Sequence, residues 1–83
     1  MAKAKFSPTY DRLRKSLVDA RKNSGLNQAD IAKRLGRPQS FMSKVESGER
    51  RLDVVEFIEL SEAIGADPVK LLRGILPNRR QKP

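Results

Sequence analysis

Apolar residues recur at spacings of three and four in five short stretches of the chain, each bounded by residues that start or stop helices. No stretch shows the strict alternation of apolar and polar residues that marks a strand. The stretches, with their bounding residues, are 7–25, 27–36, 38–48, 53–65 and 67–76. The pattern predicts an all-α fold in which five helices form one compact domain over 7–76. We expect 1–6 to be a flexible basic N-terminal arm and 77–83 a disordered basic tail.

Most of these stretches begin at a residue that caps helices well. Ser7 precedes Pro8, which suits the first helical position, and Asp67 precedes Pro68 in the same way. The third stretch instead begins at Pro38, whose side chain cannot cap a helix. In the fourth stretch, helical spacing predicts an inward stripe of Val54, Phe57, Leu60, Ser61 and Ile64.

Only Gly36 and Arg37 separate the second stretch from the third. Two helices joined by such a tight, glycine-containing turn are the sequence form of a helix-turn-helix. The second helix spans about two turns, which is too short to be stable in isolation. We therefore expect tertiary packing to hold it.

Composition narrows the possible functions. The 83 residues include no Cys and no His, so the chain has no disulfide or thiolate metal site and lacks the commonest general base and metal ligand. No nucleophile–base constellation is visible, and we expect neither an enzyme nor a bound metal or cofactor. No apolar run reaches the length of about 20 residues that spans a bilayer. The N-terminus does not resemble a signal peptide, and we expect a cytoplasmic, nucleoid-associated protein without membrane contact.

Charge is segregated along the chain. The net charge is +8, yet residues 52–69 contain five acidic side chains and no basic one. Such segregation is typical of a polyanion-binding domain with one electropositive and one acidic face. The alternative is that the charge serves only solubility. We expect the acidic side of the fourth helix, with Glu56, Glu59 and Glu62, to point away from a nucleic acid.

The stretch "LNQADIAKRLGRPQSFMSKVESGER" resembles the Xre/Cro/phage-repressor (lambda-repressor-like) family of helix-turn-helix DNA-binding proteins. The matching pieces are Gln28, "IAKRLG", "QS-x-MSKVESGER" and an apolar fourth helix ending in "EAIGAD". The resemblance covers roughly residues 10–72, with the flanking helices in register. Two positions depart from the family pattern: Pro38, where Ser or Thr is usual, and Phe41, where small or polar residues are commoner.

The resemblance implies that the third helix, about 38–47, lies in the DNA major groove. Helical geometry agrees, because with Met42 inward, Ser40, Lys44 and Ser47 fall within about 40° of the opposite direction. The candidate base contacts are Gln39, Ser40, Phe41, Ser43 and Lys44. Phe41 lies about 90° from the core direction, where it either touches a thymine methyl group or leans back over Pro38. We favour the contact with DNA.

Other polar residues surround this helix. The candidate phosphate contacts are Asn27, Gln28, Arg37, Ser47, Arg50 and Arg51. The resemblance assigns the phosphate role to Gln28, while Asn27 also suits a plain N-cap. Each arginine is alternatively a simple surface charge. Glu46 lies near the inward side, and both its position and the resemblance predict a partly buried structural salt bridge to Arg21.

The fifth stretch has more apolar side chains than one helix face can bury. We expect Leu71, Ile75 and Leu76 to form a dimer patch. The alternative is that they complete a small core.

The leading hypothesis is a sequence-specific transcriptional regulator that binds double-stranded DNA, as a homodimer on a palindromic operator. The alternative from another class is a protein-interaction module or antitoxin-like partner with the same fold. A third is nucleic-acid binding driven by charge alone.

Overall fold

Five helices follow one another in the computed structural model, which describes residues 7–76. They are α1 (Pro8–Asn23), α2 (Gln28–Leu35), α3 (Gln39–Ser47), α4 (Val54–Ile64) and α5 (Pro68–Ile75). No strand occurs between residues 7 and 76. The all-α prediction is therefore confirmed. The predicted arm (1–6) and tail (77–83) lie outside the described residues.

Local capping bonds explain why the helices begin where they do. The Ser7 hydroxyl accepts a hydrogen bond from the Tyr10 backbone at 3.1 Å, at the start of α1. Asn27 and Asp53 each form a reciprocal capping box with the acidic residue three positions later. Pro38 provides no side-chain cap for α3. Because a cap contributes about 1 kcal/mol, α3 depends more on its neighbours than the other helices do.

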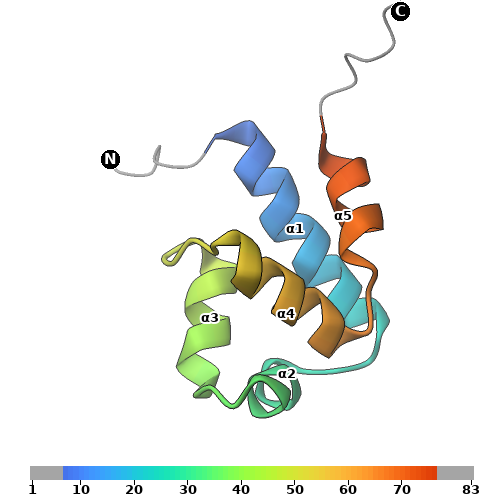
Figure 1. Ribbon diagram of the computed structural model, residues 1–83. Coiled ribbons are helices and arrows are strands. Elements are labelled where there is room, and N and C mark those ends of the chain that lie inside the picture. Colours follow the sequence, from blue (N-terminus) through green and yellow to red (C-terminus); the bar gives the residue numbers. More distant parts are fainter. Residues whose placement is uncertain (1–6, 77–83) are drawn as a thin grey trace, which may run out of the picture.

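Helices α2 and α3 form the helix-turn-helix (Figure 1). Gly36 ends α2 in the left-handed conformation, with a φ of +69°, which glycine adopts without strain. The Arg37 backbone then donates to the Ala32 carbonyl at 2.9 Å, closing the turn. Helix α4 packs against α2, while α1 packs against both α3 and α5. In Figure 1, α1 and α5 run side by side. No described helix has the length and apolar character needed to cross a membrane.

The first four helices all contribute side chains to the hydrophobic core. Its fully shielded members include Ile31 from α2, Met42 from α3 and Leu60 from α4. Leu52 and Phe57 pack into it at the two positions of a hydrophobic staple, just before and just inside α4. The prediction that Val54 faces inward is wrong, since its side chain is 73% exposed. Leu52 takes that inward role because it precedes the cap at Asp53, where the chain turns toward the core.

Phe41 also departs from its predicted position. Its exposure is 7%, and it belongs to the same core cluster as Met42 and Val45. The placement at the exposed edge of α3 is therefore wrong. The prediction used only the angle of Phe41 around the axis of α3. It could not include the guanidinium groups of Arg37 and Arg50, which lie over the ring and exclude solvent from it.

We therefore expect Phe41→Ala to lower the free energy of unfolding by about 3 kcal/mol, because it removes a buried aromatic side chain. Urea denaturation followed by circular dichroism measures this change. Lys33→Ala, at an exposed position of α2, is the control and should shift stability by less than about 0.5 kcal/mol. Equal unfolding midpoints for the two variants would contradict the packing role.

Candidate nucleic-acid interface

The exposed side of α3 is polar along its whole length. Met42 and Val45 point into the core, whereas Gln39, Ser40, Ser43, Lys44 and Ser47 are all exposed. These side chains offer both donors and acceptors, which is what the edges of base pairs in a major groove require. Four of the five predicted base-contact residues thus share one accessible face, and Phe41 does not.

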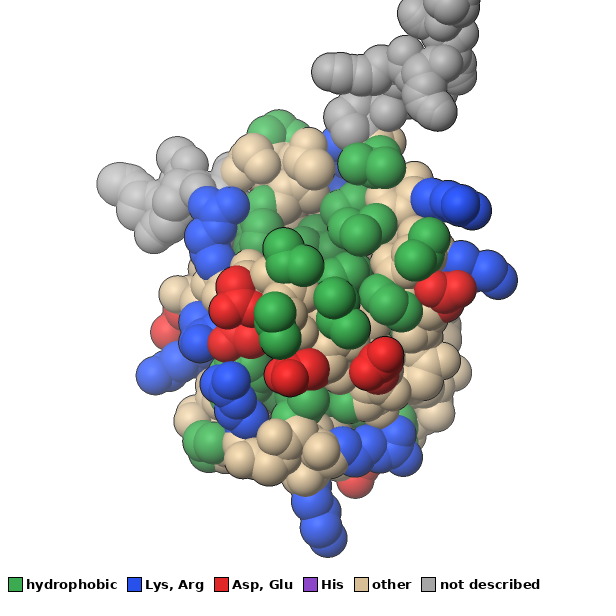
Figure 2. All heavy atoms as spheres, in the orientation of Figure 1, with side chains coloured by type: hydrophobic (Ala, Val, Ile, Leu, Met, Phe, Trp, Pro, Cys, Tyr) green, Lys and Arg blue, Asp and Glu red, His purple; other side chains and the backbone are tan. Residues whose placement is uncertain are grey.

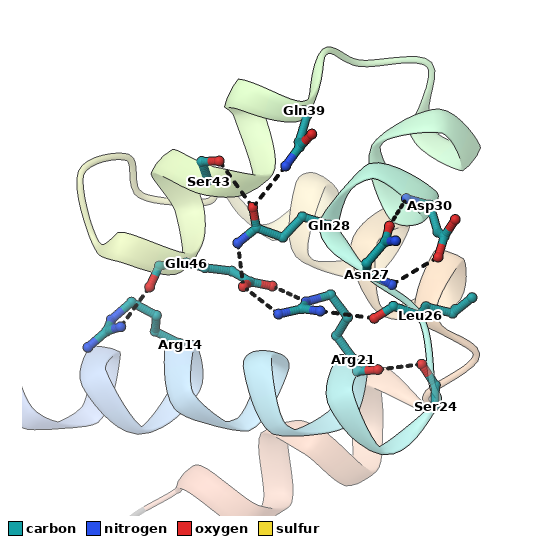
Figure 3. Close-up of polar contacts among 10 residues, drawn as sticks. All are labelled: Arg14, Arg21, Ser24, Leu26, Asn27, Gln28, Asp30, Gln39, Ser43 and Glu46. Atoms are coloured by element: carbon teal, nitrogen blue, oxygen red, sulfur yellow. Dashed lines mark hydrogen bonds and ion pairs between the residues drawn. The ribbon is translucent and has the colours of Figure 1, made fainter.

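A buried ion pair fixes α3 to α1 (Figure 3). Arg21 Nε and Nη2 donate to the two carboxylate oxygens of Glu46 at 2.6 and 3.0 Å, as the sequence analysis expects of this pair. The side chains are only 10% and 11% exposed. The remaining terminal nitrogen of Arg21 donates to the Leu26 carbonyl at 2.9 Å. Both charges are thus satisfied, which is the condition for burying them without a large penalty.

Gln28 extends this pair to the exposed face. Its Nε2 donates to Glu46 at 2.9 Å, and because a carboxylate only accepts, the amide oxygen must face α3. That oxygen accepts from the Ser43 hydroxyl at 3.1 Å and from Gln39 Nε2 at 3.5 Å. Figure 3 shows these side chains converging from α2 and α3. The sequence analysis assigned Gln28 to a phosphate contact and missed this bridging position. The signal was that a glutamine amide both donates and accepts, so it can link the carboxylate of Glu46 to polar side chains of α3.

Two further predicted phosphate contacts also have local partners. Asn27 caps α2, accepting from the Asp30 backbone at 2.8 Å, and remains exposed. The Ser47 hydroxyl donates to the Lys44 carbonyl at 3.2 Å and to Glu49 at 3.1 Å. These bonds leave both residues exposed, Asn27 at the start of α2 and Ser47 at the end of α3.

A cluster of arginines lies on the side of α3 opposite to Gln28 and Ser43. The guanidinium carbons of Arg37 and Arg50 lie 4.3 and 4.9 Å from the centre of the Phe41 ring. Arg50 forms a fork with Glu56, at 3.0 and 2.9 Å, and Arg37 approaches the same carboxylate at 3.4 Å. The prediction that Glu56 shares an outward acidic face is wrong. As the capping-box residue of α4 it turns back toward Asp53 and meets the arginines there.

The environment of Glu56 favours its charged form. Hydrogen bonds from Arg50 and from the Asp53 backbone lower the pKa of the Glu56 carboxyl to about 2, from an ordinary value near 4.5. The same hydrogen bond raises the pKa of Arg50. Both groups therefore carry their charges at neutral pH.

Arg51, the third predicted arginine, stands over a different ring. Its guanidinium carbon is 4.6 Å from the centre of the Tyr10 ring on α1. The Tyr10 hydroxyl in turn accepts from the Leu52 backbone at 3.1 Å. All three arginines around α3 thus rest on aromatic surfaces, an arrangement that limits their motion.

The apolar surplus of α5 lies elsewhere than predicted. Ile75 is buried, at 5% exposure, and Leu71 is partly buried against the core, so neither is among the large exposed apolar side chains. Of the predicted set, Leu76 remains exposed. The large exposed apolar side chains are Val54, Val55 and Ile58 of α4 and Val69, Leu72 and Leu76 of the α5 region. Figure 2 shows apolar side chains gathered over α4 and α5 with acidic and basic groups at their rim. We call these six residues the α4–α5 patch.

No group of three or more His, Cys, Asp or Glu side chains in the described part of the chain is arranged to hold a metal ion.

Comparisons with known proteins agree with this geometry. Residues 12–73 match the family described as "Helix-turn-helix domain". An Xre-family-like protein from Pseudomonas syringae superposes with a TM-score of 0.80 at 45% identity, covering 90% of this chain and 88% of that one. The restriction-modification controller protein C.AhdI from Aeromonas hydrophila gives a TM-score of 0.65 at 28% identity, covering 72% and 91%. An uncharacterised helix-turn-helix-type transcriptional regulator, y4dJ, from Sinorhizobium fredii is 35% identical over 52 residues, 63% of this chain and 68% of that protein.

The position of Glu56 predicts a specific dependence of stability on pH. Because its pKa is lower in the folded chain, its contribution is complete above about pH 5 and is lost as the pH falls from near 4.5 toward about 2. Glu56→Gln should therefore lose less stability than the wild type across this window. Urea midpoints between pH 2 and 6 measure the effect. Glu59→Gln, which removes an exposed carboxylate one turn further along α4, should keep the wild-type pH dependence; a Glu56→Gln curve parallel to both would refute the assignment.

Proposed function

The chain belongs to the Xre-like helix-turn-helix family, and we propose that it is a transcriptional regulator that binds specific double-stranded DNA sequences at the nucleoid. The relatives are regulators and controllers rather than enzymes, so the expectation that the chain is not an enzyme is confirmed. The observation that carries the proposal is the fully exposed polar face of α3, bordered on both sides by side chains that hydrogen bonds hold in place.

In this proposal α3 enters the major groove. Gln39, Ser40, Ser43 and Lys44 read base edges, with Gln39 suited to adenine and Lys44 to guanine. The phosphate contacts come from Asn27, Gln28, Arg37, Ser47, Arg50 and Arg51 around it, which set the register without reading sequence. Phe41 supports this surface from beneath and makes no base contact.

We expect selection from a random DNA pool to enrich one motif and Lys44→Ala to relax the preference at a single base position of it. Arg37→Ala should instead weaken all sequences by a similar factor and reduce the slope of log affinity against log salt concentration by about 1. Fluorescence anisotropy on the selected duplex and a scrambled duplex measures both effects.

The wild-type result decides between the classes of function. A steep salt slope without an enriched motif would leave binding by charge alone. Absence of binding would favour the alternative, a protein-interaction module or antitoxin-like partner. The exposed α4–α5 patch supports that alternative, since apolar patches of this kind mark interaction sites. Such a partner would still bind after loss of Gln39 and Lys44.

We further propose that the regulator is a homodimer on a palindromic operator, joined through the α4–α5 patch. A two-fold axis through the patch would bury its apolar side chains against their copies. Half-sites about one helical turn apart, roughly 34 Å, would follow from this symmetry.

Leu72→Glu tests the dimer, because it places a charge within the patch. We expect it to convert the protein to a monomer in sedimentation equilibrium and to weaken binding to the palindrome by at least about 10-fold while binding to one half-site is retained. Asn23→Glu adds the same charge at an exposed position of α1 outside the patch and should leave the oligomeric state unchanged. A Leu72→Glu protein that stays dimeric would place the interface elsewhere.

A further inference from the structure

One carboxylate serves two arginines on one aromatic ring. Glu56 accepts from Arg50 at 3.0 and 2.9 Å and lies 3.4 Å from Arg37, while both guanidinium groups stand over the Phe41 ring. Within the described residues no other carboxylate is shared in this way between two arginines. The cluster as a whole carries a net charge of +1, so it stays attractive to a phosphate.

The four residues come from four successive segments. Arg37 lies in the turn before α3, Phe41 on α3, Arg50 in the loop after α3 and Glu56 in the first turn of α4. The cluster therefore joins the chain on either side of the recognition helix at a single point. It occupies the flank of α3 opposite Ser43, because Phe41 and Ser43 lie about 160° apart around the helix axis.

The two arginines differ in the donors that remain to them. Both terminal nitrogens of Arg50 are engaged, one with Glu56 and the Arg51 carbonyl and the other with Glu56. Arg37 gives Glu56 one terminal nitrogen at the long distance of 3.4 Å. The two side chains are almost equally exposed, at 39% for Arg37 and 38% for Arg50. Arg50 thus anchors the carboxylate through both terminal nitrogens, whereas Arg37 keeps more of its N–H groups without a hydrogen bond to residues 7–76.

We propose that Glu56 is a positioning residue for DNA binding, which holds Arg37 and Arg50 over Phe41 so that Arg37 meets a backbone phosphate in a fixed geometry. This inference rests on the proposed function. Its physical basis is preorganisation, because a side chain already ordered in the free protein loses less rotational freedom on binding.

Simple electrostatics predicts the opposite effect. A carboxylate beside a DNA-binding face repels phosphates, so its removal should tighten binding by raising the net positive charge. Preorganisation predicts that its removal weakens binding, because the Arg37 side chain that meets the phosphate is then free to move. The sign of the change in affinity therefore separates the two accounts.

The test compares the wild type, Glu56→Gln and Glu59→Gln on the selected duplex and on a scrambled duplex, by fluorescence anisotropy. Glu59 is the matched control because it lies on the same helix, is exposed, and its side chain forms no hydrogen bond or ion pair within residues 7–76. We expect Glu56→Gln to bind both duplexes about five-fold more weakly, which corresponds to one newly mobile side chain. Glu59→Gln should bind as the wild type does or slightly more tightly.

A second variant guards against a purely structural effect. Arg50→Lys keeps the charge but cannot bridge both oxygens of Glu56, and we expect it to weaken binding to both duplexes as well. Folding is checked by circular dichroism at the assay temperature. In addition, the Nε–H signal of Arg37 in ¹⁵N NMR spectra should be ordered in the wild type and averaged by rapid motion in both variants.

Each outcome bears on a different statement. Equal or tighter binding by Glu56→Gln, or an Arg37 signal that does not change, overturns the positioning role while leaving DNA recognition intact. Failure of the wild type to bind any DNA overturns the proposed function itself, before the variants are compared.

Discussion

The recognition surface depends first on the ion pair between Arg21 and Glu46. This ion pair joins α1 to α3, and the hydrogen bond from Gln28 to Glu46 connects α2 to the same carboxylate. A carboxylate that close to the core is tolerated because every oxygen has a cationic or amide partner. The ion pair also fixes the orientation of a neighbouring side-chain amide. Since the Glu46 carboxylate can only accept, it dictates the orientation of the Gln28 amide, and that orientation decides which atoms of Gln39 and Ser43 are engaged within the protein.

Helix α3 is held differently on its two flanks. One side rests on the buried pair and its amide bridge, with nearly all the charge shielded from water. The other rests on two half-exposed arginines stacked over Phe41 and tied to Glu56. Charges on the first side are screened little by salt, whereas those on the second side remain available to phosphate and sensitive to salt. The side chains that we propose to read sequence are therefore fixed from the interior, and the arginines that we propose to bind phosphate lie at the rim of this surface.

The amino-acid sequence was sufficient for elements whose cause is local. Capping residues and glycines placed the five helices, and the spacing around Met42 separated the polar face from the core. It was insufficient where a distant segment decides the outcome. Phe41 is buried because Arg37 and Arg50 cover it. The capping box turns Glu56 toward Asp53, but its pairing with the same two arginines depends on how the loop after α3 folds back. Ile75 is buried because α1 packs against its helix, which moves the apolar surplus to Val54, Leu72 and their neighbours. The angular positions of residues around one helix axis contain no information about contacts with other segments.

The shortness of the two central helices explains why so many of their surface residues have structural partners. With 8 and 9 residues, α2 and α3 are too short to be stable alone, and α3 lacks a side-chain cap. Their geometry must therefore come from contacts with other segments, including contacts made by residues that we propose to bind DNA. Gln28, Arg37 and Arg50 each make such a contact. In so small a domain the side chains that bind and the side chains that hold the binding helix are in part the same, so affinity and local order are coupled by construction.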